Sequence, residues 1–361
     1  MYHRLLKWSG IIGITAMVLS IAGMLVYSWK KPLIYVRAEE DDQTQHQTHT
    51  GQVTFDELVP VQKEDADNLC IPVAAGVTQE AIHIDSDYMN RIMTITIDGM
   101  GTVDLSDDVY GSLTGISRIQ TADWKGQLIM MIVMDDVYEY GAILENQRLM
   151  LTLQAPREIY ERIVVIDAGH GGSDTGVRAN GIAENECVLD IAERVRELLV
   201  DEDIRVYVTR TEKENPGLQN RVLLANDVRA DMYISLHLAD GDAYGISARY
   251  NGTYFTPSLT NAELADLLVR RTAEAVNNRG VGVFTLEKLP EGAEQIEEGA
   301  EPEGAELYHA QVPAVYLVLG ALGNDDEARL LGRDDYRQDL AAGIAQAVLE
   351  AYGRKEERRA H

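Results

Sequence analysis

The sequence predicts an α/β domain with a mainly parallel sheet flanked by helices, preceded by a small β-sandwich domain and an N-terminal transmembrane helix. Three observations lead to this prediction. An uncharged apolar run lies between Trp8 and Trp29, strand patterns fill residues 71–156, and strand and helix patterns alternate over residues 157–361. A chain of 361 residues is long enough for one to three domains.

Composition excludes several classes of protein. The formal net charge of -27 repels nucleic-acid phosphates, so nucleic acid is not expected as a partner. The two cysteines, Cys70 and Cys187, are too few for a disulfide framework or a thiolate metal cluster. Both are therefore expected to be free.

Residues 1–37 are predicted to form a membrane anchor. The uncharged run from Trp8 to Trp29 is about as long as a helix that crosses a bilayer, and it is longer than the apolar core of a usual signal peptide. Residues 38–70 contain the polar and acidic run "EEDDQTQHQTHTGQ", which has few large apolar side chains. Such a composition predicts a disordered acidic linker.

Residues 71–156 carry strand patterns and no helix-length amphipathic segment. The strongest patterns are "RIMTITIDG" at 91–99, "QLIMMIVMDD" at 127–136 and "RLMLTLQAP" at 148–156. The block shows no cluster of histidine, cysteine and carboxylate residues with the spacing of a site. The strand patterns of this block predict a small β-sandwich that serves as a binding or localising module.

From residue 157 onward, strand and helix patterns alternate. Strands that are apolar on both faces and separated by helices predict a mainly parallel sheet covered on both sides. Ligands of such sheets bind at the carboxyl ends of the strands. The expected strands are 163–167, 204–210, 232–237, 281–285 and 314–320, and the expected helices begin near 184, 218, 261 and 336.

One acidic segment interrupts this alternation. Residues 290–306, "PEGAEQIEEGAEPEGAE", repeat Glu-Gly-Ala-Glu three times and contain few core-forming side chains. A solvated surface insertion is the expectation from composition.

Two histidines and one carboxylate stand where predicted strands end. His170 follows strand 163–167, His237 ends strand 232–237, and Glu184 lies where the first long helix begins. Three ligands of this kind with an open fourth position are typical of a catalytic zinc site. Manganese and iron stay open as alternatives, as does the hypothesis that the histidines are unrelated loop residues.

Two aspartates near His170 are candidates to orient the metal ligands. Asp167 and Asp174 are close enough in sequence to accept hydrogen bonds from ligand N–H groups.

The glycines of "IDAGHGG", 166–172, do not match a dinucleotide-binding loop, because the third glycine is misplaced. The chain contains neither the G-x-S-x-G pentapeptide of α/β-hydrolases nor a phosphate-binding G-x-x-x-x-G-K-[ST] loop.

Several longer segments follow one another in the order of a known family. They include "VVIDAGHGGSDTG" (164–176), "GIAENECVLDIA" (181–192), "ADMYISLH" (230–237) and "VPAVYLVLGALGN" (312–324). On these motifs, residues 163 to about 352 resemble the zinc-dependent N-acetylmuramoyl-L-alanine amidases of bacterial cell-wall remodelling. The preceding β block resembles the AMIN-type module that often accompanies these domains.

The resemblance implies Zn²⁺ bound by His170, Glu184 and His237, and hydrolysis of the amide between the muramic acid lactyl group and L-alanine in peptidoglycan. In the family pattern a glutamate of the last strand takes a proton from water, and Val318 occupies that position here. Other departures lie close by. Ala321 replaces a phenylalanine, Gly323 a serine and Ala239 an asparagine.

Two hypotheses follow from these departures. In the first, the chain is a working amidase whose base is Asp240, Glu186 or an acid of 290–306. In the second, it is an inactive relative that binds peptidoglycan or regulates a true amidase, with an amidase or a division-complex component as partner. A further hypothesis, taken from members of the family with an inserted segment over the zinc, is that residues 291–306 cover the metal and supply a carboxylate as its fourth ligand. Both hypotheses place the chain in the cell membrane through a single span, with its domains outside the cytoplasm.

Overall fold

The computed structural model describes residues 54–63, 66–105, 109–242, 244–252, 259–286 and 303–359. The predicted membrane anchor and most of the linker and the acidic insertion lie outside these residues. Within the described part of the chain, no helix is long and apolar enough to cross a membrane. The chain divides into two compact units. The N-terminal unit contains the residues up to Gln154 except Tyr88–Asn90. The C-terminal unit contains Tyr88–Asn90 and the residues from Ala155 onward.

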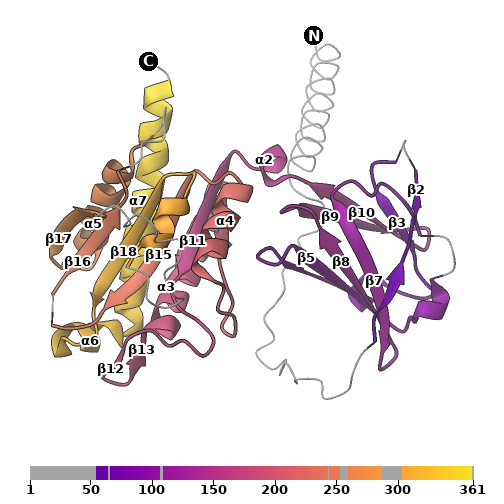
Figure 1. The fold of residues 1–361 in the computed structure, drawn as a ribbon, viewed down its shortest axis with the longest axis horizontal. Helices are drawn as coiled ribbons and strands as arrows, with labels where there is room; N and C mark the ends of the chain where they lie inside the picture. The colour runs from indigo at the N-terminus through magenta and orange to yellow at the C-terminus, as the bar shows by residue number, and fades with distance from the viewer. Residues whose placement is uncertain are drawn as a thin grey trace, which may run out of the picture. The chain divides into compact units, whose positions relative to one another are not determined.

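The N-terminal unit contains two five-stranded sheets (Figure 1). The first has the order β1 (Asp56–Leu58), β7 (Ile116–Trp124), β8 (Gln127–Met134), β5 (Ile92–Asp98) and β4 (Ile82–Asp87). The second has the order β2 (Val61–Gln62), β6 (Tyr110–Gly111), β3 (Leu69–Pro72), β10 (Arg148–Gln154) and β9 (Glu139–Glu145). Two short 3-10 helices, η1 (Gln79–Ala81) and η2 (Thr102–Asp104), lie between strands.

The two sheets share one apolar core, as a β-sandwich requires. Strand β8 buries every second side chain, Leu128, Met130, Ile132 and Met134, against residues of the other sheet such as Ile71. The β-sandwich prediction is therefore confirmed. Strands β1 and β2 lie inside the stretch 38–70 that the sequence predicts as linker. Both are short and contribute mostly exposed or partly exposed side chains, so no apolar pattern marks them.

The C-terminal unit is built on a six-stranded sheet. Its order is β14 (Ile204–Val208), β11 (Arg162–Ala168), β15 (Met232–Ala239), β18 (Ala314–Ala321), β16 (Ile246–Tyr250) and β17 (Gly280–Thr285). The first four strands are parallel, as predicted. Strand β16 runs antiparallel to β18 and parallel to β17, so the sheet is mixed at this edge. A small hairpin joins β12 (Arg178–Ala179) and β13 (Ile182–Ala183).

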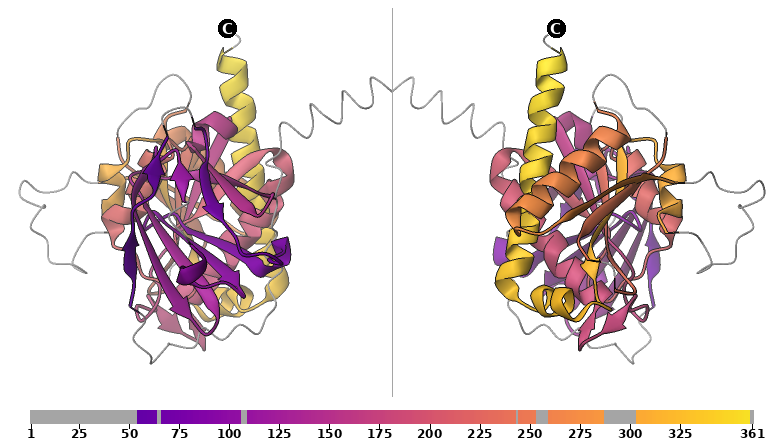
Figure 2. Two further views of the ribbon diagram at one scale, coloured as in Figure 1. Left: turned by 90° about the vertical axis from the view of Figure 1, so that its right-hand side faces the viewer. Right: turned by 90° about the vertical axis from the view of Figure 1, so that its left-hand side faces the viewer.

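Helices cover both faces of this sheet. Helices α3 (Glu184–Leu199), α5 (Asn261–Ala275) and α7 (Asp334–Arg359) share one core with it, and Figure 2 shows α5 beside α7. Helix α4 (Leu218–Asp227) contacts η5 (Ala305–His309), and these two elements contact β11, β15 and β18 from the other face. The remaining elements are α2 (Pro156–Ile159), η3 (Val200–Glu202) and α6 (Asp325–Leu331).

Strand alternation puts the site residues on the α4 face of the sheet. Val164, Ile166, Ile234 and Leu236 enter the core shared with α3. The residues between them along the strands must point the other way. Because Asp167 pairs with Ser235, and His237 with Val318, polar side chains of β11 and β15 share that opposite face with Val318 of β18.

Candidate metal centre

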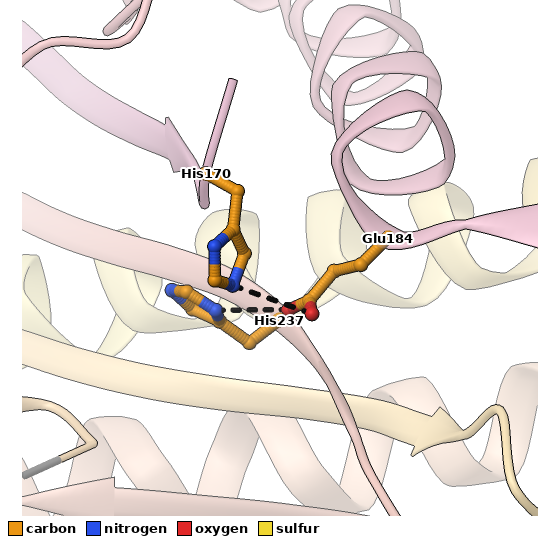
Figure 3. Close-up of side chains that lie close together, drawn as sticks. All are labelled: His170, Glu184 and His237. Atoms are coloured by element: carbon orange, nitrogen blue, oxygen red, sulfur yellow. Dashed lines mark hydrogen bonds and ion pairs between the residues drawn. The ribbon is translucent and has the colours of Figure 1, made fainter. Parts of the chain in front are cut away.

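Three side chains converge at the carboxyl edge of the sheet (Figure 3). His170 comes from the loop after β11, Glu184 is the first residue of α3, and His237 lies near the end of β15. Glu184 Oε2 lies 3.3 Å from His170 Nε2, and Glu184 Oε1 lies 3.0 Å from His237 Nδ1. One potential ligand atom from each residue lies within 4.8 Å of the others.

Glu184 is held as a carboxylate. Its side chain is 1% exposed, and its two oxygens also accept hydrogen bonds from the backbone N–H groups of Val177 and Leu238, both at 2.9 Å. Burial alone would raise the pKa of Glu184, but hydrogen bonds and charge from His170 and His237 outweigh it and hold the pKa well below its ordinary value. Glu184 is therefore negative at neutral pH.

His170 is oriented by a second carboxylate. Asp174 Oδ2 lies 2.8 Å from His170 Nδ1, on the side of the ring away from Glu184, as the sequence spacing suggests. Burial opposes a charged imidazole, but Glu184 and Asp174 together raise the pKa of His170 to about 9. The surroundings of this ring therefore favour a positive charge, which a proton or a bound cation supplies.

The glycines of the loop make room for the cluster. A Cβ atom on Gly169 would lie 2.2 Å from Cε1 of His237, and one on Gly176 would lie 2.5 Å from Glu184 Oε2. Both distances are far shorter than real Cβ contacts, so only glycine fits at either position. His170 itself has a left-handed backbone with φ 59°, which is uncommon for a side chain other than glycine.

Two buried arginines fix the backbone of this loop. Arg221 donates to the carbonyl oxygens of Ala168 at 2.8 Å and of His170 at 2.6 Å. Arg210 donates to the carbonyl oxygens of Ala168 at 2.7 Å and of Gly169 at 2.9 Å. The sequence motifs assign neither arginine a role. Each arginine belongs to a further segment that resembles the same family, "VTRTE" at 208–212 or "NRVLLAN" at 220–226.

Asp167 accepts hydrogen bonds from residues other than the two histidines. Its oxygens accept from Thr209 (2.6 Å), Arg221 (2.8 Å), Ser235 (2.7 Å) and Tyr233 (3.0 Å). Burial would raise the pKa of Asp167, but these donors and the arginine charge hold it well below the ordinary value. The expected bond to a ligand N–H is not formed, because all the acceptor directions already have donors. Asp167 instead anchors Arg221.

His237 has further neighbours that the sequence did not single out. Its ring stacks on Tyr316, with centroids 4.1 Å apart and planes 16° apart. Potential ligand atoms of Asp167, His237 and Glu306 also lie within 4.8 Å of one another. Glu306 is the last residue of the predicted insertion and is 3% exposed. Burial raises the pKa of its carboxyl group against the opposing charge of His237.

The cluster suits a metal ion by its chemistry. The carboxylate of Glu184 bridges the two imidazoles, with one oxygen toward His170 and the other toward His237. Imidazole and carboxylate are ligands of Zn²⁺, and three such ligands leave one position for substrate or water.

Comparison with known proteins identifies the family. Residues 164–350, more than half of the chain, match the family described as N-acetylmuramoyl-L-alanine amidase. The chain belongs to that family. As a member it is a hydrolase that cleaves the amide bond of peptidoglycan in cell-wall remodelling, and the comparisons do not favour the hypothesis of an inactive relative.

Individual relatives cover the same half of the chain. N-acetylmuramoyl-L-alanine amidase AmiA of Escherichia coli (strain K12) is 28% identical over 233 residues, 56% of this chain and 80% of the relative. The uncharacterized protein YqiI of Bacillus subtilis (strain 168) is 29% identical over 209 residues, 56% of this chain and 93% of the relative. An N-acetylmuramoyl-L-alanine amidase structure from Clostridium difficile 630 is 28% identical, with a TM-score of 0.46, and covers 54% of this chain and 98% of that one.

The position of the family glutamate is aliphatic in the structure as well. Val318 is buried in β18 and pairs with His237. The two acids nearest to the ligands in sequence, Asp240 and Glu186, stay predictions as replacement bases. Asp240 is exposed and accepts from the backbone N–H of Gly241 at 2.8 Å, and Glu186 is exposed on α3. Neither belongs to a metal-binding cluster of the described residues.

Proposed function

We propose that this amidase binds Zn²⁺ through His170, Glu184 and His237 and uses it to hydrolyse the bond between N-acetylmuramic acid and L-alanine. The observation that carries the proposal is the double contact of Glu184, which holds both histidines from one carboxylate. The exposed side of His170, whose side chain is 29% exposed, gives the substrate a route to the centre.

The chain's own residues supply orientation and charge. When bound, Zn²⁺ supplies Lewis-acid polarisation of the amide carbonyl and activates water for attack. Asp174 orients His170, Glu184 carries negative charge toward the metal, and the two arginines keep the loop backbone in place. Val318 takes part in no proton transfer, so turnover without a carboxylate there is expected to be slow.

The rest of the chain supports a location at the cell wall. We propose that the N-terminal β-sandwich is an AMIN-like module that binds peptidoglycan, and that residues 1–37 anchor the chain by a single span in the cell membrane. Both domains would then lie outside the cytoplasm, where the substrate is. A true amidase or a division-complex component is the kind of partner that this arrangement suits.

Dye release from labelled, purified peptidoglycan tests the proposed activity. A fragment without residues 1–37 is freed of metal, reloaded with Zn²⁺ and compared with its His170→Ala and Glu184→Gln variants. Zinc-dependent release that both variants lose supports the proposal. Release that persists in the presence of a chelator, or in both variants, contradicts it.

A binding-only role is the alternative outcome of the same assay. Sedimentation with insoluble peptidoglycan measures binding without hydrolysis. If wild-type protein binds peptidoglycan but releases no dye at any zinc concentration, and Val318→Glu does release dye, then the chain is a binding or regulatory relative.

A further inference from the structure

Glu306 is a buried carboxylate with one oxygen that has no hydrogen-bond partner among the described residues. It lies in η5, directly after the acidic segment, and only 3% of it is exposed. Its Oε1 atom accepts no hydrogen bond from the described residues. An unpaired buried carboxylate oxygen is costly, so such a group usually has a partner that is absent or about to form.

Its polar neighbours include Ser235 and His237, which both oppose the effect of burial on the pKa of the Glu306 carboxyl group. Potential ligand atoms of Glu306, His237 and Asp167 lie within 4.8 Å of one another. Asp167 is not a donor, and its oxygens are already taken by Thr209, Arg221, Ser235 and Tyr233. His237 directs Nδ1 to Glu184, and among the described residues its Nε2 forms no hydrogen bond. Nε2 of His237 and Oε1 of Glu306 are thus two polar atoms of this neighbourhood without a hydrogen bond among the described residues.

We propose that Glu306 is a positioning residue that accepts the Nε2–H of His237, directly or through one water molecule. A histidine whose Nδ1 lone pair faces a metal ion must carry its proton on Nε2, and a carboxylate at Nε2 fixes that tautomer and the ring orientation. A ring nitrogen of His237 and a carboxylate oxygen of Glu306 lie within 4.8 Å of each other, which is within reach of one bridging water. The inference rests on the proposed role of His237 as a metal ligand.

A second glutamate at this end of the acidic segment, Glu303, is connected to the His237 ring through Arg249 and Tyr316. Glu303 pairs with Arg249 at 2.8 Å, and the Arg249 guanidinium lies 5.9 Å from the centre of the Tyr316 ring. Tyr316 stacks on His237. Glu303 and Glu306, three residues apart, are therefore both connected to His237, Glu303 through Arg249 and Tyr316 and Glu306 through its own carboxyl group.

Zinc affinity tests this role, with Glu306→Gln as the variant. Glutamine keeps the size of the side chain but removes the carboxylate charge. Because carboxylates behind metal-ligating histidines are worth a factor of about 10–100 in metal affinity, we expect Glu306→Gln to weaken zinc binding by that factor in a chelator competition. Glu327→Gln is the matched control, since Glu327 is equally buried but accepts from the backbone of Gly245 and Ala321. The control should lower the Tm and leave zinc affinity unchanged.

Three outcomes would overturn the inference. Wild-type zinc affinity in folded Glu306→Gln would show that Glu306 does not position His237. Unchanged zinc affinity with lost dye release, restored by adding Val318→Glu, would make Glu306 the missing base instead. If His170→Ala and His237→Ala both keep wild-type zinc affinity, the metal centre itself is wrong and the inference falls with it. Weakened zinc binding that Val318→Glu does not restore supports the inference.

Discussion

Val318 lies directly opposite His237 in the parallel register of β18 and β15. Both side chains are on the α4 face of the sheet, so a carboxylate at position 318 would stand beside a metal ligand. The family pattern has glutamate there. The amidase centre of this chain therefore keeps the three proposed ligands and has an aliphatic side chain where the family pattern has its base.

Restoring the carboxylate should accelerate hydrolysis. We expect Val318→Glu to raise the rate of dye release by about 10²–10⁴-fold, the usual contribution of a general base. Val318→Gln is the control, because it adds the same volume and polarity without a group that accepts a proton near neutral pH. Equal rates in Val318→Glu, Val318→Gln and wild type would mean that position 318 does not contribute to proton transfer.

The loop glycines should be intolerant of a methyl group. Gly169→Ala places Cβ 2.2 Å from the His237 ring, so the loop or the ring must move by about an ångström. We expect dye release to fall by about 10²-fold, as is usual for such misplacement. Gly217→Ala is the control, since a Cβ atom there meets nothing within 4 Å and the backbone is not left-handed. Similar activity of both variants would contradict the crowding argument.

Arg221 should be important for stability. Arg221→Ala leaves the buried Asp167 without its ion-pair partner and two loop carbonyls without a donor. Breaking such a buried pair lowers the free energy of unfolding by about 3–5 kcal/mol, which urea denaturation can measure. The exposed pair of Arg329 with Asp326 provides the comparison, and Arg329→Ala should cost about 0–1 kcal/mol.

Stability should decline at alkaline pH through Cys187. Burial raises the pKa of the Cys187 thiol from its ordinary value of 9.0 to about 12, although the charge of Arg337 opposes the rise. Because the folded pKa is above the unfolded one, this stabilisation is complete below pH 9 and is lost as the pH rises toward 12. The loss is on the order of 4 kcal/mol for three pKa units. Denaturation of Cys187→Ala across this range should show a shallower decline than wild type, and parallel curves would exclude the thiol as the cause.

Much of the fold could be predicted because local patterns determine it. Strands β11, β15 and β18 carry apolar side chains on both faces along most of their length and are buried on both, and this pattern predicts parallel strands inside a covered sheet. His170 and His237 follow or end two of these strands, so a common edge could be expected for them. The antiparallel direction of β16 could not, because "ISARY" is too short and mixed in character to carry a directional signal.

The remaining parts of the centre depend on contacts between residues far apart in sequence. Arg210 and Arg221 reach the His170 loop from positions about 40 and 50 residues away, and an arginine in a polar stretch does not reveal that it will be buried. Glu306 ends a segment whose composition predicts exposure to solvent. Its burial follows from the contacts of η5 with α4 and β18, which only the folded chain shows.

Anomalous diffraction at the zinc edge, from crystals of the metal-loaded amidase domain, tests the central claim most directly. The account predicts one strong peak in contact with His170, Glu184 and His237 together, and no peak at this place in crystals of Glu184→Gln. A zinc-loaded crystal without a peak among these three side chains, or with a peak that the Glu184→Gln variant retains, would contradict it.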